Sequence, residues 1–234
     1  DLAGQFALLR HFFREPTGYS TETLRRQKAA VGGRHAFGTA VGTPGFHSWM
    51  CWTQGGVEPL AYAEADCPHL LAELREMHER VTLKQLEMIL DSGEFEHILL
   101  GQSGSITLAS PELFDKYCLP TLVKATRMCK QAGVPTMLHS CGKQMHLVRR
   151  CAEQTDLDCV NPLEVPPMGD CDLAEVKRLY GHKLALMGNL HTTDVMLKGS
   201  VDDVRRAARK AIDDAGAGGG FILSTGDQCG RDTP

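Results

Sequence analysis

The chain has 234 residues, of which 23% are charged and 42% are hydrophobic, and its formal net charge is −4. This length is sufficient for one large domain with a single core. This small negative net charge argues against a broad surface that binds nucleic acid or anionic membranes, because such a surface would need clustered lysine and arginine. No apolar run approaches the length of a transmembrane helix, and the first residues lack a signal-peptide pattern, so we expect a cytoplasmic protein.

The nine cysteines raise the question of a secreted disulfide framework. Their odd number argues against one, and buried free thiols are common in reducing compartments. Nothing in the pattern singles out Cys159 or Cys171. Five others sit within ordinary helix or loop patterns and are expected to be inert thiols, namely Cys51, Cys67, Cys118, Cys129 and Cys151.

Taken in chain order, the sequence begins with a segment, 2–30, that we expect to be helical. From about residue 35, short apolar runs alternate with amphipathic segments. The apolar runs show little polar alternation and are rich in Val, Ile, Leu and Phe, which is typical of strands buried on both faces of a parallel sheet. We predict strands over 36–41, 97–100, 135–138, 159–163, 184–187 and 221–223.

The amphipathic segments between these strands have recognisable helix ends. We expect a long helix over 66–90 that ends near Gly93, and a second over 110–133. Ser110 and Pro111 supply an N-cap and a proline at the first helical position of the second helix. Further helices are expected over 147–154, 172–180 and 200–214.

This alternation predicts either a (β/α)8 barrel or an open doubly wound sheet. No Gly-x-Gly-x-x-Gly follows the first strand, so the usual mark of a dinucleotide site is missing from the sequence. We therefore predict an α/β fold of the (β/α)8 TIM-barrel type, as a single domain over 1–234. About six of the eight βα units are visible, and we expect the barrel to be incomplete at both ends of this chain.

His139 and Cys141 follow directly on the strand expected over 135–138. Residues two apart on a strand project to the same side, and imidazole and thiolate are both zinc ligands. Glu164 and Cys229 follow two later strands, and the carboxyl ends of parallel barrel strands meet at one rim. One zinc ion could therefore bind His139, Cys141, Cys229 and Glu164, since thiolate ligation favours zinc over magnesium or calcium.

Other polar side chains near strand ends are candidates for the same site. We expect Glu164, Asp227 and Asn189 to be catalytic, and Asp227 is also a candidate acceptor for the second ring nitrogen of a zinc-bound histidine. Each of these residues could instead be a polar cap at a strand-to-loop junction, and an aromatic side chain could serve packing alone. The candidate substrate-binding residues are Gln102, Asn161, His191 and Trp49.

Several short motifs resemble the uroporphyrinogen decarboxylase superfamily, whose fold is a (β/α)8 barrel. They include His139-Ser140-Cys141-Gly142, Asn161-Pro162-Leu163-Glu164, Gly188-Asn189-Leu190 and Thr225-Gly226-Asp227. The resemblance implies two alternative chemistries. One is metal-free decarboxylation of tetrapyrrole acetate side chains, which in that family depends on an amino-terminal arginine-rich motif that has no match here.

The other branch consists of zinc methyltransferases that work with corrinoid proteins, such as the methanogen methylcobamide:coenzyme M methyltransferases. Their His-x-Cys signature followed much later by Cys is matched by His139, Cys141 and Cys229. The site is also similar to that of cobalamin-independent methionine synthase, with the order His-x-Cys, Glu, Cys. That similarity is the reason for including Glu164 among the ligands.

The resemblance thus favours a zinc-dependent methyltransferase over a metal-free decarboxylase or a non-catalytic barrel. It implies a small methyl donor of the methyl ether, methanol or methylamine type, or a thiol acceptor. No corrinoid-binding Asp-x-His-x-x-Gly motif occurs in the chain. We therefore expect cobalamin to be carried by a separate corrinoid protein, and we leave a homodimer open.

Overall fold

A parallel sheet organises the protein. The computed structural model describes the backbone of residues 2–234 and the side chains of residue 6 and residues 8–234. The six strands are β1 (Gly38–Val41), β2 (His97–Gly101), β3 (Thr136–His139), β4 (Cys159–Asn161), β5 (Ala185–Leu190) and β6 (Phe221–Thr225). All six predicted strands are thereby confirmed. Each strand pairs in parallel with the next one along the chain, which is the order of six successive units of a (β/α)8 barrel.

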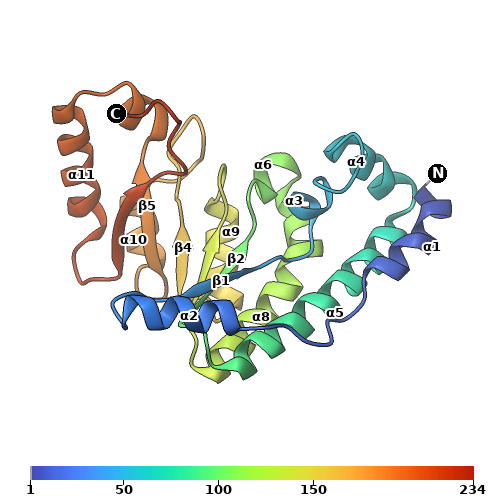
Figure 1. Cartoon of the computed structure of the whole chain (residues 1–234). Coiled ribbons are helices and arrows are strands. Elements are labelled where there is room, and N and C mark those ends of the chain that lie inside the picture. Colours follow the sequence, from blue (N-terminus) through green and yellow to red (C-terminus); the bar gives the residue numbers. More distant parts are fainter. Residues whose placement is uncertain (1) are drawn as a thin grey trace.

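Closure by eight strands and the single-domain organisation remain predictions. Helices occupy the connections between the strands, as a parallel sheet requires (Figure 1). The helices are α1 (Leu2–Phe12), α2 (Glu22–Val31), α3 (Phe46–Trp49), α4 (Val57–Asp66), α5 (Pro68–Ser92), α6 (Ser105–Leu108), α7 (Pro111–Leu113), α8 (Leu119–Ala132), α9 (Met145–Gln154), α10 (Leu173–Tyr180) and α11 (Val201–Ala215), with π-helical turns η1 (Phe114–Cys118) and η2 (Thr192–Leu197).

The helix expected over 110–133 is divided into α7, η1 and α8, the helix expected over 147–154 begins at Met145, and two further predictions differ in ways that proline explains. The long helix expected over 66–90 is α5, which begins at Pro68, because proline has no N–H to donate and suits the first turn. Its predicted end is confirmed, since Gly93 caps it in the left-handed conformation. The prediction of continuous helix over 2–30 is wrong, because the chain is non-helical between α1 and α2, where Pro16 lies.

Alternation along the strands decides which side chains face the helices. On β3, Thr136 and Leu138 are buried, whereas Met137 and His139 are only half-buried. The buried positions of neighbouring strands, including Ile98, join a core with α5 and α8. Burying one such aliphatic side chain contributes about 1.5–3 kcal/mol. Because this packing fixes the outward face of β3, His139 must point to the opposite face.

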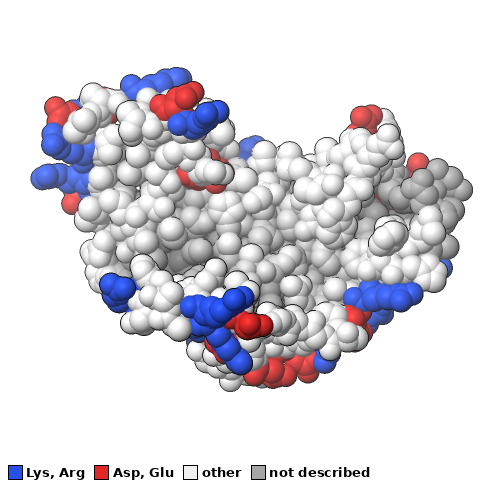
Figure 2. Space-filling view, viewed as in Figure 1, with Lys and Arg blue, Asp and Glu red and all other residues white. Residues whose placement is uncertain are grey.

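The carboxyl ends of the strands lie together along one edge, at the top of Figure 1. Figure 2 shows this edge hollowed between two raised parts, with most charged side chains around the periphery and on the lower face. No helix in the described part of the chain is long and apolar enough to cross a bilayer. Most of the predicted site residues lie at or just beyond the carboxyl ends of these strands.

Candidate metal centre

Three side chains with metal-binding atoms converge at the carboxyl ends of β3 and β6. The ligand atoms of His139, Cys141 and Asp227 lie within 4.8 Å of one another, and all three residues are half-buried. The Nε2 atom of His139 lies 3.8 Å from Oδ1 of Asp227. These three residues combine the nitrogen, sulfur and oxygen ligands that zinc accepts.

Asn161 holds the imidazole of His139 from the other side. The two residues are register partners on β3 and β4, and Asn161 Oδ1 lies 2.6 Å from His139 Nδ1. An amide oxygen only accepts, so Nδ1 donates its proton, and in the neutral ring the lone pair is then on Nε2, which faces Asp227. From the sequence we considered Asp227 for the orienting contact and Asn161 for substrate binding. The structure instead gives the orienting contact to Asn161.

Glu164 lies beside this group without being part of it. Its buried carboxylate accepts a hydrogen bond from the N–H of Gly142, which directly follows Cys141. The preceding residue, Leu163, has a left-handed backbone with φ of 60°, and its carbonyl accepts a hydrogen bond of 3.1 Å from Asn189 Nδ2. Asn189, predicted to be catalytic, therefore contacts the loop that carries Glu164.

Cys229 also lies outside the group of three. It is half-buried and follows Asp227 by two residues on the loop after β6. In the described structure the group therefore contains one thiol, where the sequence had suggested two. Asp227 had been recognised as a rim residue because it follows the strand directly, but its side chain takes a position that the sequence had assigned to Cys229.

The acidic groups of the centre oppose one another's ionisation. Burial, and next the charge of Asp227, raise the pKa of the Cys141 thiol. Burial also raises the pKa of Glu164, against the opposing effect of the Gly142 hydrogen bond. Among the described residues, neither carboxylate forms a salt bridge with lysine or arginine. A divalent cation bound by these groups would favour their ionised forms, so the donor set fits a zinc ion.

Two predicted substrate residues have their polar atoms engaged elsewhere. Trp49 is 1% exposed and donates its indole N–H to His78 Nδ1 at 3.2 Å. Gln102 is fully buried, where its side chain contacts Thr43 and Ser105. Gln102 thereby joins the ends of β1 and β2, whereas Trp49 packs in a cluster of helical residues that includes Phe46 and Leu71, and neither enters the function proposed below.

The sequence did not point to Gln144, which ties the ends of β3 and β4 together. Its fully buried amide donates to the carbonyls of Ser140 and Asn161 and accepts from the N–H of Leu163 at 2.8 Å. A glutamine at a helix start carries no periodicity signal that would mark it as buried. Its contacts fix the backbone on both sides of the candidate ligands.

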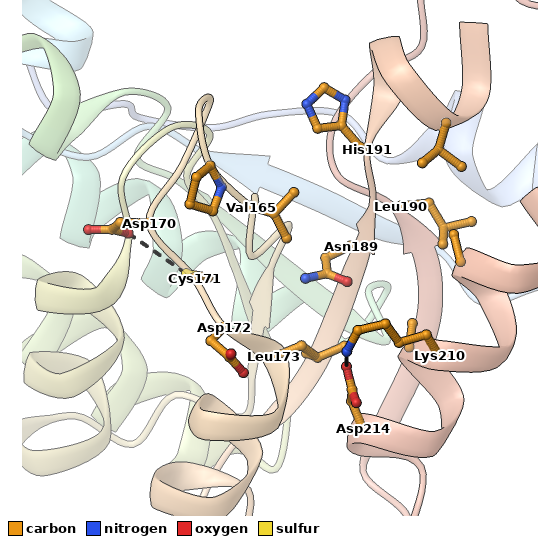
Figure 3. A pocket seen from close by; sticks show the side chains of 14 residues that line it. Val165, Asp170, Cys171, Asp172, Leu173, Asn189, Leu190, His191, Lys210 and Asp214 are labelled. Carbon is orange, nitrogen blue, oxygen red and sulfur yellow. Dashed lines mark hydrogen bonds and ion pairs between the residues drawn. The ribbon is translucent and has the colours of Figure 1, made fainter. Parts of the chain in front are cut away.

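A pocket of about 420 Å³ lies between the loop after β4, β5 and α11, and none of the three residues of the centre lines it (Figure 3). Its lining includes His191, Asn189 and Leu173, and at its far side Lys210 forms an ion pair with Asp214. A second, much smaller cavity shares His191 and Asn189 with this pocket and reaches Glu164. Of the predicted substrate residues, His191 is thus the one that lines both cavities.

Comparison with known proteins supports a family relationship. The family model "Uroporphyrinogen decarboxylase (URO-D)" matches residues 12–234. Two curated proteins of Methanosarcina mazei are similar over part of the chain. The methylcobamide:CoM methyltransferase MtbA is 28% identical over 144 residues, which is 61% of this chain and 38% of that protein. A methylated-thiol–coenzyme M methyltransferase is 27% identical over 118 residues, which is 50% of this chain and 29% of that protein.

The chain therefore spans less than two-fifths of the length of these curated relatives. Among solved structures, a methyltransferase from Methanosarcina mazei superimposes with a TM-score of 0.68 at 18% identity, covering 91% of this chain and 59% of the other. At this identity the similarity shows the fold alone. It agrees with the parallel α/β arrangement described above.

Proposed function

Because this chain belongs to the uroporphyrinogen decarboxylase (URO-D) family, and its curated relatives are methyltransferases, we propose that it is a zinc-dependent methyltransferase. The reaction moves a methyl group between a small donor and a corrinoid protein, or from a methylcorrinoid to a thiol. The donor is of the methyl ether, methanol or methylamine type. The relatives' printed names support methyl transfer, whereas the substrate class is our inference.

The observation that carries this proposal is the convergence of His139, Cys141 and Asp227 within 4.8 Å. Three protein ligands leave a fourth position of a tetrahedral zinc ion for substrate, which is the pattern of catalytic zinc sites. Structural sites are closed by four protein ligands and commonly use paired cysteine knuckles. We accordingly propose Asp227 as the third ligand, with Cys229 and Glu164 outside the first coordination sphere.

A zinc ion bound there supplies Lewis-acid chemistry, which lowers the pKa of a thiol or polarises the oxygen of a methyl ether or alcohol. The protein's part is to hold the ligands in place. Asn161 fixes the tautomer and orientation of His139, so that Nε2 faces the centre. Glu164, through Gly142, holds the loop that presents Cys141. All three ligand side chains are only half-buried, which leaves the centre accessible to a substrate.

The partner in this proposal is a corrinoid protein that docks over the hollow rim. Two observations support it: the relative named as a methylcobamide:CoM methyltransferase, and the hollow along the edge that holds the carboxyl ends of the strands (Figure 2). Transfer to or from cobalt requires the methyl group to approach the substrate in line. A wide, shallow opening suits a docking protein better than it suits a small enclosed ligand.

The test combines metal analysis with two methyl-transfer assays. Protein purified without chelators should contain about one zinc per chain. It should either convert Co(I) cobalamin to methylcobalamin with one of a panel of methoxylated compounds, methanol and methylamines, or demethylate methylcobalamin with one of a panel of thiols. The visible spectrum of the corrinoid reports both directions.

Metal-free protein that lacks both activities would contradict the proposal. Decarboxylation of uroporphyrinogen by that metal-free protein would instead establish the other chemistry that the family name suggests. Zinc-containing protein that is inactive in both assays, and in which loss of zinc lowers only thermal stability, would indicate a structural metal. These three outcomes are distinguishable with one preparation and its chelator-treated control.

A further inference from the structure

His191, directly after β5, has different surroundings at its two ring nitrogens. Nδ1 accepts hydrogen bonds from the backbone N–H groups of Thr193 and Asp194, at 3.2 and 3.1 Å, and thereby caps η2. Because Nδ1 accepts, the neutral ring carries its proton on Nε2. The capping contacts thus fix a tautomer in which Nε2–H is a hydrogen-bond donor.

This donor is buried and has no hydrogen-bond partner among the described residues. Asp194 Oδ2 lies 3.8 Å from Nε2, which is too long for a hydrogen bond. The side chain as a whole is only 12% exposed. Leaving a buried donor unsatisfied costs about 1–3 kcal/mol, so a partner at this position is expected on energetic grounds.

The cavity next to His191 identifies that partner. It has a volume of about 10 Å³, close to the minimum that admits one water molecule, and Glu164, Asn189 and Gly226 also line it. Among the described residues that line it, Glu164 is the one that carries a carboxylate, whereas Asn189 directs its side-chain N–H to the carbonyl of Leu163.

We propose that His191 is a positioning residue, whose Nε2–H donates through one water in this cavity to the Glu164 carboxylate. Glu164 in turn accepts from the N–H of Gly142, beside Cys141. A chain of polar contacts thus runs from His191, which follows β5 and caps η2, to the loop after β3. Its link to metal binding rests on the proposed function, whereas the contact between His191 and Glu164 does not.

Substitution by asparagine separates the two roles of His191. In His191→Asn the side-chain oxygen can still cap η2, because asparagine is a favoured N-cap, but the Nε2 donor is lost. His191→Ala loses both the cap and the donor. Glu164→Gln removes the acceptor charge, and His182→Asn, at an exposed histidine, is the matched control. The double variant His191→Asn/Glu164→Gln completes a double-mutant cycle, which measures the coupling between the two side chains.

The primary readout is hydrogen exchange of the Gly142 amide in the purified full chain. We expect His191→Asn to speed this exchange about tenfold while keeping the thermal midpoint near that of the wild type. His191→Ala should show the same acceleration with a lower midpoint. The double variant should exchange no faster than Glu164→Gln alone, because both changes act through one contact.

Unchanged Gly142 exchange in His191→Asn would overturn the proposal, as would effects that add fully in the double variant. The second readout is the zinc dissociation constant, measured by chelator competition, which His191→Asn should raise about tenfold as outer contacts of metal sites typically do. A wild-type protein that binds no zinc contradicts the proposed function. Even then, the exchange rate of the Gly142 amide tests independently whether His191 contacts Glu164.

Discussion

Asn161 Oδ1 accepts a hydrogen bond from His139 Nδ1 at 2.6 Å, across the register pair that joins β4 to β3. This contact sets both the tautomer and the direction of the imidazole before any ligand binds. It leaves the unprotonated Nε2 facing Asp227 at 3.8 Å. Orientation of a histidine ligand by a carbonyl-type oxygen is a common outer contact of zinc sites.

The first prediction concerns this contact. Asn161→Ala should weaken zinc binding by about 10–100-fold, because the ring loses its orienting acceptor. Asn161→Asp keeps an acceptor at the same position and should stay within about threefold of the wild type. Zinc affinity is measured by competition with a chromophoric chelator. Equal losses in both variants would mean that the amide acts through packing, not through its oxygen.

The second prediction distinguishes the two candidates on the loop after β6. Asp227→Asn should lower zinc affinity by about 100-fold or more, whereas Cys229→Ser, two residues away, should retain it. Cobalt(II) in place of zinc gives an independent signal, since thiolate-to-cobalt absorption reports bound cysteine. That band should persist in Cys229→Ser and disappear in Cys141→Ser. Loss of zinc in Cys229→Ser with retention in Asp227→Asn would reverse our ligand assignment.

The third prediction is a pH dependence of stability that arises away from the metal centre. Burial lowers the pKa of His78 to about 4 from a usual 6.5, and its Nδ1 accepts from the indole of Trp49. The unfolded chain therefore takes up this proton near pH 6.5, whereas the folded protein resists it until about pH 4. Folding stability should fall as the pH drops through this window, by about 3 kcal/mol at its lower end.

His78→Gln should remove that part of the acid sensitivity, because glutamine can accept from the indole but does not titrate. The free energy of unfolding is measured by urea titration at pH 7, 5.5 and 4.5. His182→Gln, at an exposed position, serves as the control and should follow the wild type. Some dependence of stability on pH should remain in His78→Gln, because burial also lowers the pKa of His47 to about 4. Parallel wild-type and His78→Gln curves would refute the prediction.

The fourth prediction concerns a buried carboxylate that joins two helices. Glu79 on α5 accepts from Thr121 and Lys124 on α8, at 2.8 and 2.6 Å, and pairs with Arg75. Burial alone would raise the pKa of Glu79. The hydrogen bonds from Lys124 and Thr121 nevertheless hold this pKa below its usual value. Glu79→Ala should lower the free energy of unfolding by about 2–3 kcal/mol.

Glu76→Ala, on the exposed side of the same helix, is the matched control and should change stability by less than about 0.5 kcal/mol. Because the folded-state pKa of Glu79 is depressed, its contribution is present above the ordinary carboxyl range and is lost as the pH falls below it. Glu79→Ala should accordingly lose less stability between pH 6 and pH 3 than the wild type does. Equal losses over this range would show that Glu79 is not linked to acid unfolding.

Local features of the sequence determined much of the fold. Each of the six strands was predicted because short apolar runs rich in Val, Ile, Leu and Phe, with little polar alternation, favour a doubly buried parallel sheet. The end of α5 at Gly93 followed from the conformational freedom of glycine. The proximity of His139 and Cys141 was also predicted from the sequence, because residues two apart on a strand project to the same side, although β3 itself ends at His139.

The sequence did not determine which side chains from different strand ends contact one another. Asp227 and Cys229 differ by two positions on one loop, and only the path of that loop after β6 brings Asp227 within reach of His139 and Cys141. Asn161 takes its role because β3 and β4 pair in one particular register. Such contacts depend on how separate strands align and how loops fold over them, so the tertiary structure alone assigns the third side chain and the orienting partner of the centre.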